Sequence, residues 1–244
     1  MILPFNHHVR EGEKKMTIKS IVKVGSKGSY GRGFWVGSPD YGLIVTAAHC
    51  LPYYPTRRDD VLCYSDLTYA DLVARPDGKG TCWAECLFLD PVADLAVLTE
   101  PCNQFLSEES DKFSDFASRS EFLEIGSLAD GETSARIMFN NSESIPCIVE
   151  TNSRLLTRGF TIKKTDGKIK SGMSGSPILT DDGKVVGVLC NDDTGPILSR
   201  CLPPWILNLA KTARERWEEP EGSLEEWAKN LSRSASPPTD ATNR

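Results

Sequence analysis

A serine flanked by glycines is the feature of this sequence best suited to nucleophilic chemistry. Ser174 lies between Gly172 and Gly175 in the segment SGMSGSPIL, just before an apolar run. Glycine lets the backbone turn sharply, so the amides of Gly172 and Ser174 can point at one spot and form an oxyanion hole. One such donor stabilises a transition state by about 3 kcal/mol. The segment predicts a nucleophilic serine, and a simple Gly/Ser turn before a strand is the alternative.

A histidine and an aspartate elsewhere in the chain supply the partners that such a serine needs. Because His7 and His8 lie in a polar N-terminal segment, His49, which follows the apolar run LIVT, is the predicted general base. Asp94 enters the apolar stretch LAVL, where a carboxylate needs a hydrogen-bond partner such as an imidazole N–H. Taken singly, a structural histidine and a surface aspartate are the commoner explanations. Since the neutral imidazole is the working base, activity is expected to fall as the pH drops through about 6.5.

These three segments resemble the trypsin/chymotrypsin-like serine peptidases. The resemblance rests on TAAHC around His49, DLAVL around Asp94 and GMSGSP around Ser174, in the family's order of His, Asp and Ser. It covers about residues 18–210. It implies two six-stranded antiparallel barrels with the site between them, and a serine endopeptidase that works through an acyl-enzyme. The substrate would be a protein or peptide, and no cofactor is implied.

The sequence departs from the secreted digestive members of that family at informative places. Met173 stands where those members have an aspartate that pairs with a new N-terminus, and the strand GRGFWVG has no cysteine opposite Cys50. The chain therefore looks closer to the HtrA-like and glutamyl endopeptidase branches. Without the ion pair, the oxyanion loop has no evident lock. We therefore expect an enzyme held inactive until a partner or ligand orders that loop, with a regulatory protein as the partner.

The resemblance also implies a specificity pocket. Its floor falls near Lys168 and its walls near Leu189, Cys190 and Asn191. Lys168 pointing inward would favour an acidic side chain before the cut bond, whereas Asp192 reaching in would favour a basic one. Glutamyl endopeptidases carry a histidine where Leu189 stands. A solvated loop is the alternative for Lys168, so the preference stays open.

The chain as a whole has an all-β pattern with a helical end. Short β-rich runs separated by turn residues predict the two barrels. Helical spacing of apolar residues after Pro204, and Ser223 followed by Glu226 in capping-box form, predict C-terminal helices. The expected segments are a polar leader (1–17), a first barrel (18–115), a second barrel (116–202), the helices (203–231) and a disordered tail (232–244).

Composition restricts the other classes of function. With 28 Lys and Arg against 34 Asp and Glu, the net charge of −6 argues against nucleic-acid binding. We find no apolar run of about 18 residues and no secretion signal, so we expect no membrane partner and a cytoplasmic location. The eight cysteines have no dense framework spacing and are expected to be free thiols. Cys82 and Cys86 lack a second pair at zinc-finger spacing, so no metal site is expected.

Two alternatives to a serine enzyme remain. A catalytically silent relative would bind peptides or a partner in the cleft where its relatives hold their substrates. The presence of all three residues, His49, Asp94 and Ser174, argues against it. A cysteine-based enzyme would use Cys50 beside His49, but neighbours along a strand point to opposite faces. Cys190 is expected near the cleft, where thiol reagents would reach it.

Overall fold

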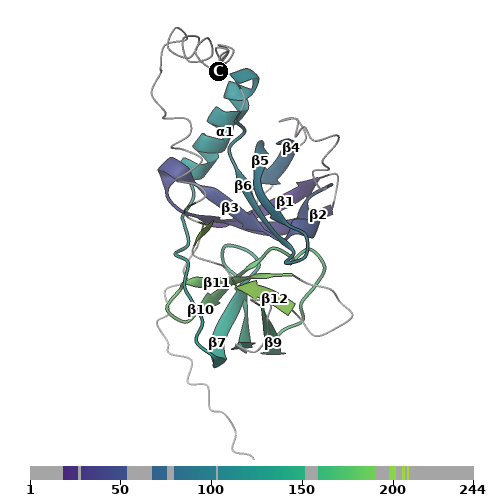
Figure 1. The fold of residues 1–244 in the computed structure, drawn as a ribbon, viewed down its shortest axis with the longest axis vertical. Coiled ribbons are helices and arrows are strands. Elements are labelled where there is room, and N and C mark those ends of the chain that lie inside the picture. Colours follow the sequence, from purple (N-terminus) through teal and green to yellow (C-terminus); the bar gives the residue numbers. More distant parts are fainter. Residues whose placement is uncertain are drawn as a thin grey trace, which may run out of the picture. The chain divides into compact units, whose positions relative to one another are not determined.

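The chain folds into two closed antiparallel barrels of six strands each, which confirms the predicted all-β fold class (Figure 1). The computed structural model describes residues 19–26, 29–53, 68–75, 80–102, 104–151, 159–190 and 198–201, with Trp205, Ile206 and Asn208. All of these residues belong to one compact unit, Met1–Ala210.

The first barrel has the strand order β1-β2-β3-β6-β5-β4 and closes by pairing Lys23 of β1 with Ala74 of β4. Its strands are β1 (Ile21–Ser26), β2 (Ser29–Val36), β3 (Leu43–Thr46), β4 (Thr68–Ala74), β5 (Thr81–Asp90) and β6 (Leu95–Thr99). All four residues of β3 are buried, so both faces of this strand are covered. A strand covered on both faces reads as a continuous apolar run, which is the pattern seen just before His49.

The second barrel has the order β10-β11-β12-β9-β8-β7 and closes by pairing Ile178 of β10 with Ile137 of β7. Its strands are β7 (Gly131–Met138), β8 (Ser144–Thr151), β9 (Gly159–Thr165), β10 (Pro177–Thr180), β11 (Val185–Leu189) and β12 (Leu198–Cys201). The segment before β10 carries Ser174, so the predicted nucleophile enters this barrel directly from its loop.

The two barrels share one apolar core in addition to a core of their own. The shared cluster contains Phe34 and Val45 from the first barrel and Leu179 and Val185 from the second. Ile206, which is fully buried, belongs to the same cluster. Burial of apolar side chains against each other is the main favourable contribution to folding. The shared cluster therefore joins the two barrels to each other.

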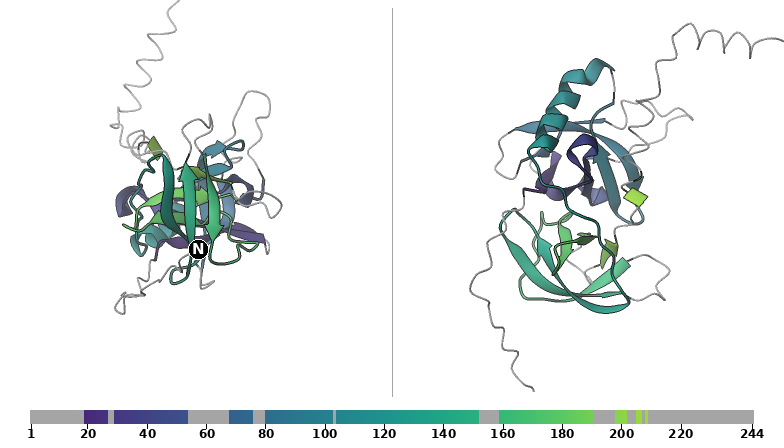
Figure 2. Two further views of the ribbon diagram at one scale, coloured as in Figure 1. Left: turned by 90° about the horizontal axis from the view of Figure 1, so that it is seen from below. Right: turned by 90° about the vertical axis from the view of Figure 1, so that its left-hand side faces the viewer.

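An α-helix lies at the expected boundary between the two barrels. Among the described residues that precede the second barrel, the helical segments are η1 (Pro39–Tyr41), η2 (Ala48–Cys50), η4 (Gln104–Leu106) and α1 (Ser107–Ser118). Phe113, Phe116 and Ala117 of α1 are buried, at the spacing that places them on one helical face. This face packs against Trp35 of the first barrel, and the ring of Phe113 lies 5.1 Å from it edge-on. Figure 2 shows α1 lying against the first barrel. The expected boundary between residues 115 and 116 falls inside α1.

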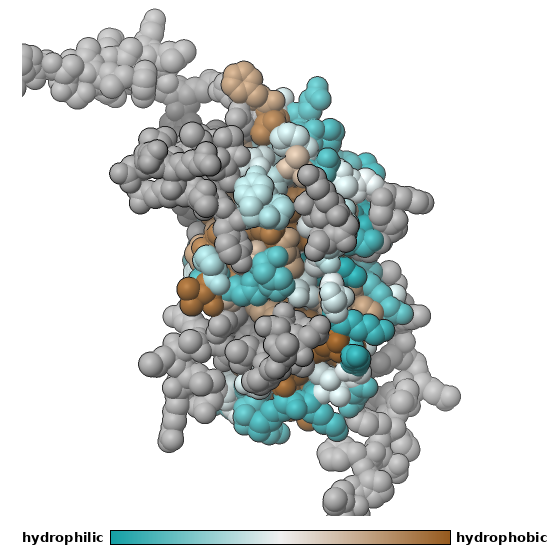
Figure 3. Space-filling view, turned by 90° about the vertical axis from the view of Figure 1, so that its right-hand side faces the viewer, coloured by the Kyte–Doolittle hydropathy of each residue, from teal (hydrophilic) through white to brown (hydrophobic). Residues whose placement is uncertain are grey.

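The predicted C-terminal helices are described only at their beginning. Trp205, Ile206 and Asn208 are helical, and the Trp205 ring lies edge-on at 4.9 Å from Phe88 of β5. The expected leader, the second C-terminal helix and the tail lie outside the described residues. No helix in the described part of the chain is long and apolar enough to cross a membrane. On the face drawn in Figure 3, apolar residues lie in several separated places among hydrophilic ones.

Trp35 should be a main source of stability in the first barrel. It is fully buried, contacts Phe113, Phe116 and Phe122, and its indole N–H has no hydrogen-bond partner in the described structure. We expect Trp35→Ala to lower the free energy of unfolding by about 4 kcal/mol in a urea titration, because it leaves a large cavity. Trp35→Phe should cost much less, since no hydrogen bond is lost. Equal losses in the two variants would contradict this account.

Candidate active site

The carboxylate of Asp94 holds both the backbone and the ring of His49. Pairing of β3 with β6 brings the two residues together, because His49 follows β3 in η2 and Asp94 directly precedes β6. One oxygen of Asp94, Oδ2, lies 2.7 Å from His49 Nδ1, and the other, Oδ1, accepts the His49 backbone N–H at 2.9 Å. An acceptor at Nδ1 favours the tautomer with the proton there, which leaves Nε2 as the base. The His49 side chain is 41% exposed, so a substrate can reach it.

Asp94 adopts a backbone conformation that non-glycine residues rarely take. Its φ of 53° lies in the left-handed region, which costs an L-residue about 1–2 kcal/mol. The surrounding structure maintains it, because the Asp94 carbonyl accepts the Ala48 N–H at 3.2 Å and the Cys190 thiol at 3.4 Å. Strained backbone that is held in this way is a recurrent feature of functional sites. Here it directs the carboxylate toward His49.

The backbone of Ser174 docks onto the first barrel beside His49. Its carbonyl accepts the Arg32 N–H of β2 at 2.7 Å and lies 3.6 Å from the thiol of Cys50, the residue after His49. A Cβ at Gly31 would lie 2.2 Å from Cys50 Sγ and 2.8 Å from the Ser174 carbonyl oxygen. Glycine at position 31 is therefore required for this close approach. The structure thus brings the loop of the second barrel that carries the predicted nucleophile to the part of the first barrel that carries the predicted base.

The backbone before Ser174 forms a type II turn that leaves two amides open. The Met173 N–H donates to the Lys170 carbonyl at 3.2 Å, and Gly172, at the third position of the turn, has φ +83°. Because Ser171 does not have positive φ, this combination defines type II. Among the described residues, neither the Gly172 nor the Ser174 N–H donates to an acceptor. These are the two amides that the sequence predicted for the oxyanion hole.

The hydroxyl of Ser174 has no hydrogen-bond partner within the part of the chain that the structure describes. In enzymes without substrate, the bonds among catalytic groups are often long and tighten only when substrate binds. Ser174 as a whole residue is half-buried.

The side chain of Met173 anchors the type II turn of residues 170–173, the predicted oxyanion turn, in the core of the second barrel. Its side chain is only 6% exposed and packs within the cluster of that barrel. Its thioether sulfur also accepts the Lys170 N–H at 3.2 Å. The sequence suggested that Met173 left this loop without an internal lock. In the structure, the Met173 side chain at this position is buried in the apolar core of the second barrel.

Arg32 is a positioning residue that the sequence did not reveal. Besides its amide contact with Ser174, its side-chain Nε donates to the Phe139 carbonyl of the second barrel at 2.8 Å. Burial lowers the pKa of this guanidinium. The buried hydroxyl of Thr46 in β3 donates to the Arg32 carbonyl at 2.6 Å and so ties β2 to β3 at this residue. The only sequence signal was an arginine between two glycines in the strand GRGFWVG.

The residues predicted to line a specificity pocket occupy different environments. Leu189 is fully buried in the core of the second barrel, and its carbonyl accepts the Gly175 N–H at 2.7 Å. Cys190 is half-buried with its thiol at the Asp94 carbonyl, and Lys168 is exposed. Asn191 lies outside the described residues. Leu189 thus holds the backbone next to Ser174, and Cys190 bonds the backbone of Asp94. The specificity pocket itself stays a prediction.

The described cysteines are free thiols. They are Cys50, Cys82, Cys86, Cys102, Cys147 and Cys190. Burial raises the pKa of the Cys50 thiol to about 11, so it is neutral near pH 7 despite its position beside His49. A thiolate is the nucleophilic form of cysteine, and this environment disfavours it. No group of three His, Cys, Asp or Glu side chains within the described ranges is placed to hold a metal ion.

Comparison with known proteins identifies the family. A family model described as a trypsin-like peptidase domain matches residues 31–188, a range that includes all three predicted catalytic residues. The chain therefore belongs to the trypsin-like peptidase domain family. It is a serine protease, and its substrates are proteins or peptides.

Solved structures share the fold at low sequence identity. The chain is similar to the inactive form of the Rv3671c protease of M. tuberculosis, at 18% identity and a TM-score of 0.50, with 90% of this chain and 91% of that chain covered. It is also similar to the serine endoprotease from Yersinia pestis, at 18% identity and a TM-score of 0.47, with 83% and 63% covered. The likeness to the Rv3671c protease shows the fold alone. A search of curated proteins found no match.

Alanine at position 172 should disable the oxyanion turn with little loss of stability. The positive φ of Gly172 is strained for alanine, and the new Cβ would lie 3.1 Å from the Tyr30 carbonyl, so the amide should rotate away. We expect kcat/KM for a peptide substrate to fall about 100-fold, the usual cost of losing one oxyanion donor. Gly183→Ala is the matched control, since Gly183 has φ +85° and nothing within 4 Å of the new Cβ. Full activity in Gly172→Ala would contradict the assignment.

Cys50 should resist alkylation although it neighbours the general base. With the thiol pKa raised to about 11, the group stays protonated below that pH. We expect iodoacetamide at about pH 7.5 to leave both activity and Cys50 unmodified, as measured by peptide mass mapping. The same treatment in urea, where the thiol returns to its ordinary pKa of about 8.5, should modify it. Rapid alkylation of Cys50 in the folded enzyme, with loss of activity, would instead support a cysteine nucleophile.

Proposed function

We propose that this protein is a serine endopeptidase that hydrolyses peptide bonds through His49, Asp94 and Ser174. The observation that carries the proposal is the double contact of the Asp94 carboxylate with His49, at 2.9 Å and 2.7 Å. Two open amides beside the nucleophile, at Gly172 and Ser174, complete the set of groups that acyl transfer needs.

In this mechanism each residue has a defined role. The Ser174 hydroxyl attacks the carbonyl carbon of the peptide bond while His49 Nε2 takes its proton. Asp94 holds the ring and stabilises the imidazolium that forms. The oxygen that becomes negative is bound by the amides of Gly172 and Ser174. His49 then gives the proton to the departing amine, which leaves an acyl-enzyme, and a water molecule activated by His49 releases the acid.

The proposal treats the oxyanion turn as already formed in the free chain. Its type II geometry and the buried Met173 anchor support this view, because both arise within the second barrel. A partner would then control access to the site or the supply of substrate. The expectation drawn from the missing ion pair, that a partner or ligand orders the loop, is the alternative to this view.

Labelling with a fluorophosphonate tests the proposal directly. The purified chain alone should form a 1:1 phosphonyl adduct that maps to Ser174, and Ser174→Ala should form none. Ser176→Ala is the matched control, because the Ser176 hydroxyl is fully buried and has no hydrogen-bond partner in the described structure. This variant should label like the wild type. Chelators should have no effect on labelling.

Two outcomes would contradict parts of the proposal separately. Absence of labelling in a protein whose circular dichroism shows it to be folded would contradict an assembled nucleophile. Labelling that appears only after a second protein or ligand is added would contradict the preformed turn while leaving the triad intact.

A further inference from the structure

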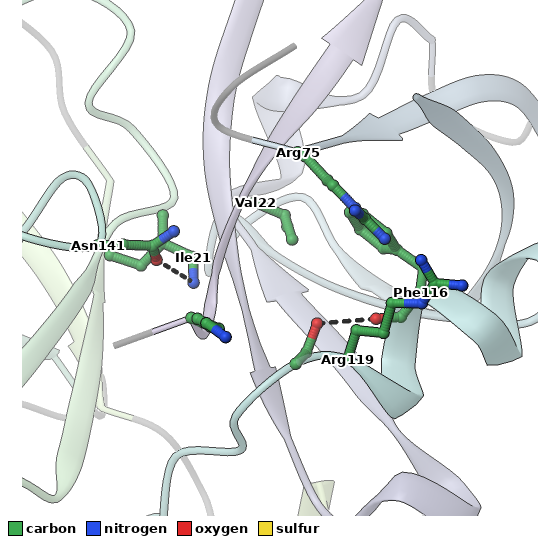
Figure 4. A pocket seen from close by; sticks show the side chains of 8 residues that line it. Ile21, Val22, Arg75, Phe116, Arg119 and Asn141 are labelled. Atoms are coloured by element: carbon green, nitrogen blue, oxygen red, sulfur yellow. Dashed lines mark hydrogen bonds between the residues drawn. The ribbon is translucent and has the colours of Figure 1, made fainter. Parts of the chain in front are cut away.

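A cavity of about 630 Å³ lies beside the C-terminal end of α1, and its lining includes none of the residues of the triad or the oxyanion turn. Figure 4 shows Arg75, Phe116 and Arg119 on one side of it and Ile21 and Asn141 on the other. Its volume is within the range of small-molecule sites. The lining comes from both barrels, since Asn141 follows β7 and accepts the Ile21 N–H of β1 at 3.2 Å.

The charged groups that line this cavity are all cationic. They are Lys19, Arg75 and Arg119, in a chain whose net charge is −6. Arg119 is paired with Asp115 at 2.5 Å, one turn earlier on α1. Lys19 and Arg75 have no ion-pair partner among the described residues. The cavity therefore has an excess of positive charge that the described residues do not neutralise.

The hydrogen-bond donors of Arg75 and Asn141 remain available to a ligand in the cavity. The Arg75 guanidinium lies over the Phe116 ring at 5.1 Å, a contact that uses its face and leaves the N–H groups at its edge. Asn141 accepts the Ile21 N–H through Oδ1, and its amide NH₂ makes no hydrogen bond in the described structure. Guanidinium edges match carboxylates and phosphates by paired hydrogen bonds.

We propose that this cavity binds a small ligand carrying at least two oxyanion groups, either carboxylates or phosphates. One group binds Arg75 and Arg119 beside Phe116, and the other binds Lys19 and the Asn141 amide. A ligand bound in this way contacts the first barrel through α1 and β4 and the second barrel through the turn after β7. Binding at this site is independent of the catalytic residues.

Calorimetric titration with citrate and with tripolyphosphate tests this site, with sodium chloride at equal ionic strength as the blank. At least one of the two should bind with a Kd below about 1 mM. Lys19→Gln and Arg75→Gln should each weaken binding about tenfold, since each removes one charge-assisted contact. Lys164→Gln, which removes an equal charge from an exposed position on β9, should stay within about twofold of the wild type.

Comparing the two ligands shows whether the site prefers carboxylate or phosphate groups. Citrate binding alone would assign the site to carboxylates, and tripolyphosphate binding alone would assign it to phosphates. Binding of neither would overturn the proposal. So would equal weakening in Lys19→Gln, Arg75→Gln and Lys164→Gln, because that result indicates attraction to general surface charge. Titration of Ser174→Ala should give the wild-type Kd, which separates this test from that of catalysis.

Discussion

The hydrogen bond from the Arg32 amide to the Ser174 carbonyl is the contact on which the proposed site depends, because the proposed base and the proposed nucleophile belong to different barrels. Two glycines allow it. A Cβ at Gly31 would meet Cys50 and Ser174, and a Cβ at Gly175 would lie 1.9 Å from the Arg32 carbonyl. The shared apolar cluster fixes the barrels over a larger area, and this backbone contact sets the position of the nucleophile within it.

Within each barrel a second constraint orients the reacting groups. In the first barrel, Asp94 is held in a left-handed conformation so that one carboxylate bonds His49 twice. In the second, the buried side chain of Met173 holds the turn that exposes the amides on either side of it. The two devices differ chemically, one being a strained polar contact and the other an apolar anchor. In the proposed mechanism, the two together position the base and the oxyanion donors before substrate binds, which is how active sites avoid the free-energy cost of reorganisation.

The sequence predicted the two-barrel fold. It also identified the catalytic candidates, because each lies in a short motif whose residue types suit a step of acyl transfer. It did not predict α1, since only Phe113, Phe116 and Ala117 mark an apolar face within an acidic segment. The anchoring of Met173 was also missed, because burial of a loop residue depends on a barrel assembled from distant strands. Arg32 was missed for the same reason, as its partners Ser174 and Phe139 are far along the chain. The pocket roles expected for Leu189 and Cys190 came from the family resemblance, which does not reveal which side of the strand each side chain faces in this chain.

The central claim is that one preformed site uses Ser174 as nucleophile and the amides of Gly172 and Ser174 as oxyanion donors. A crystal structure of the enzyme with a peptide boronic acid tests it most directly. We predict a covalent bond from boron to Ser174 Oγ, with one boronate oxygen about 2.7–3.1 Å from both amide nitrogens. An adduct whose oxygens contact neither amide, or boron bound to another residue in the folded protein, would contradict the account.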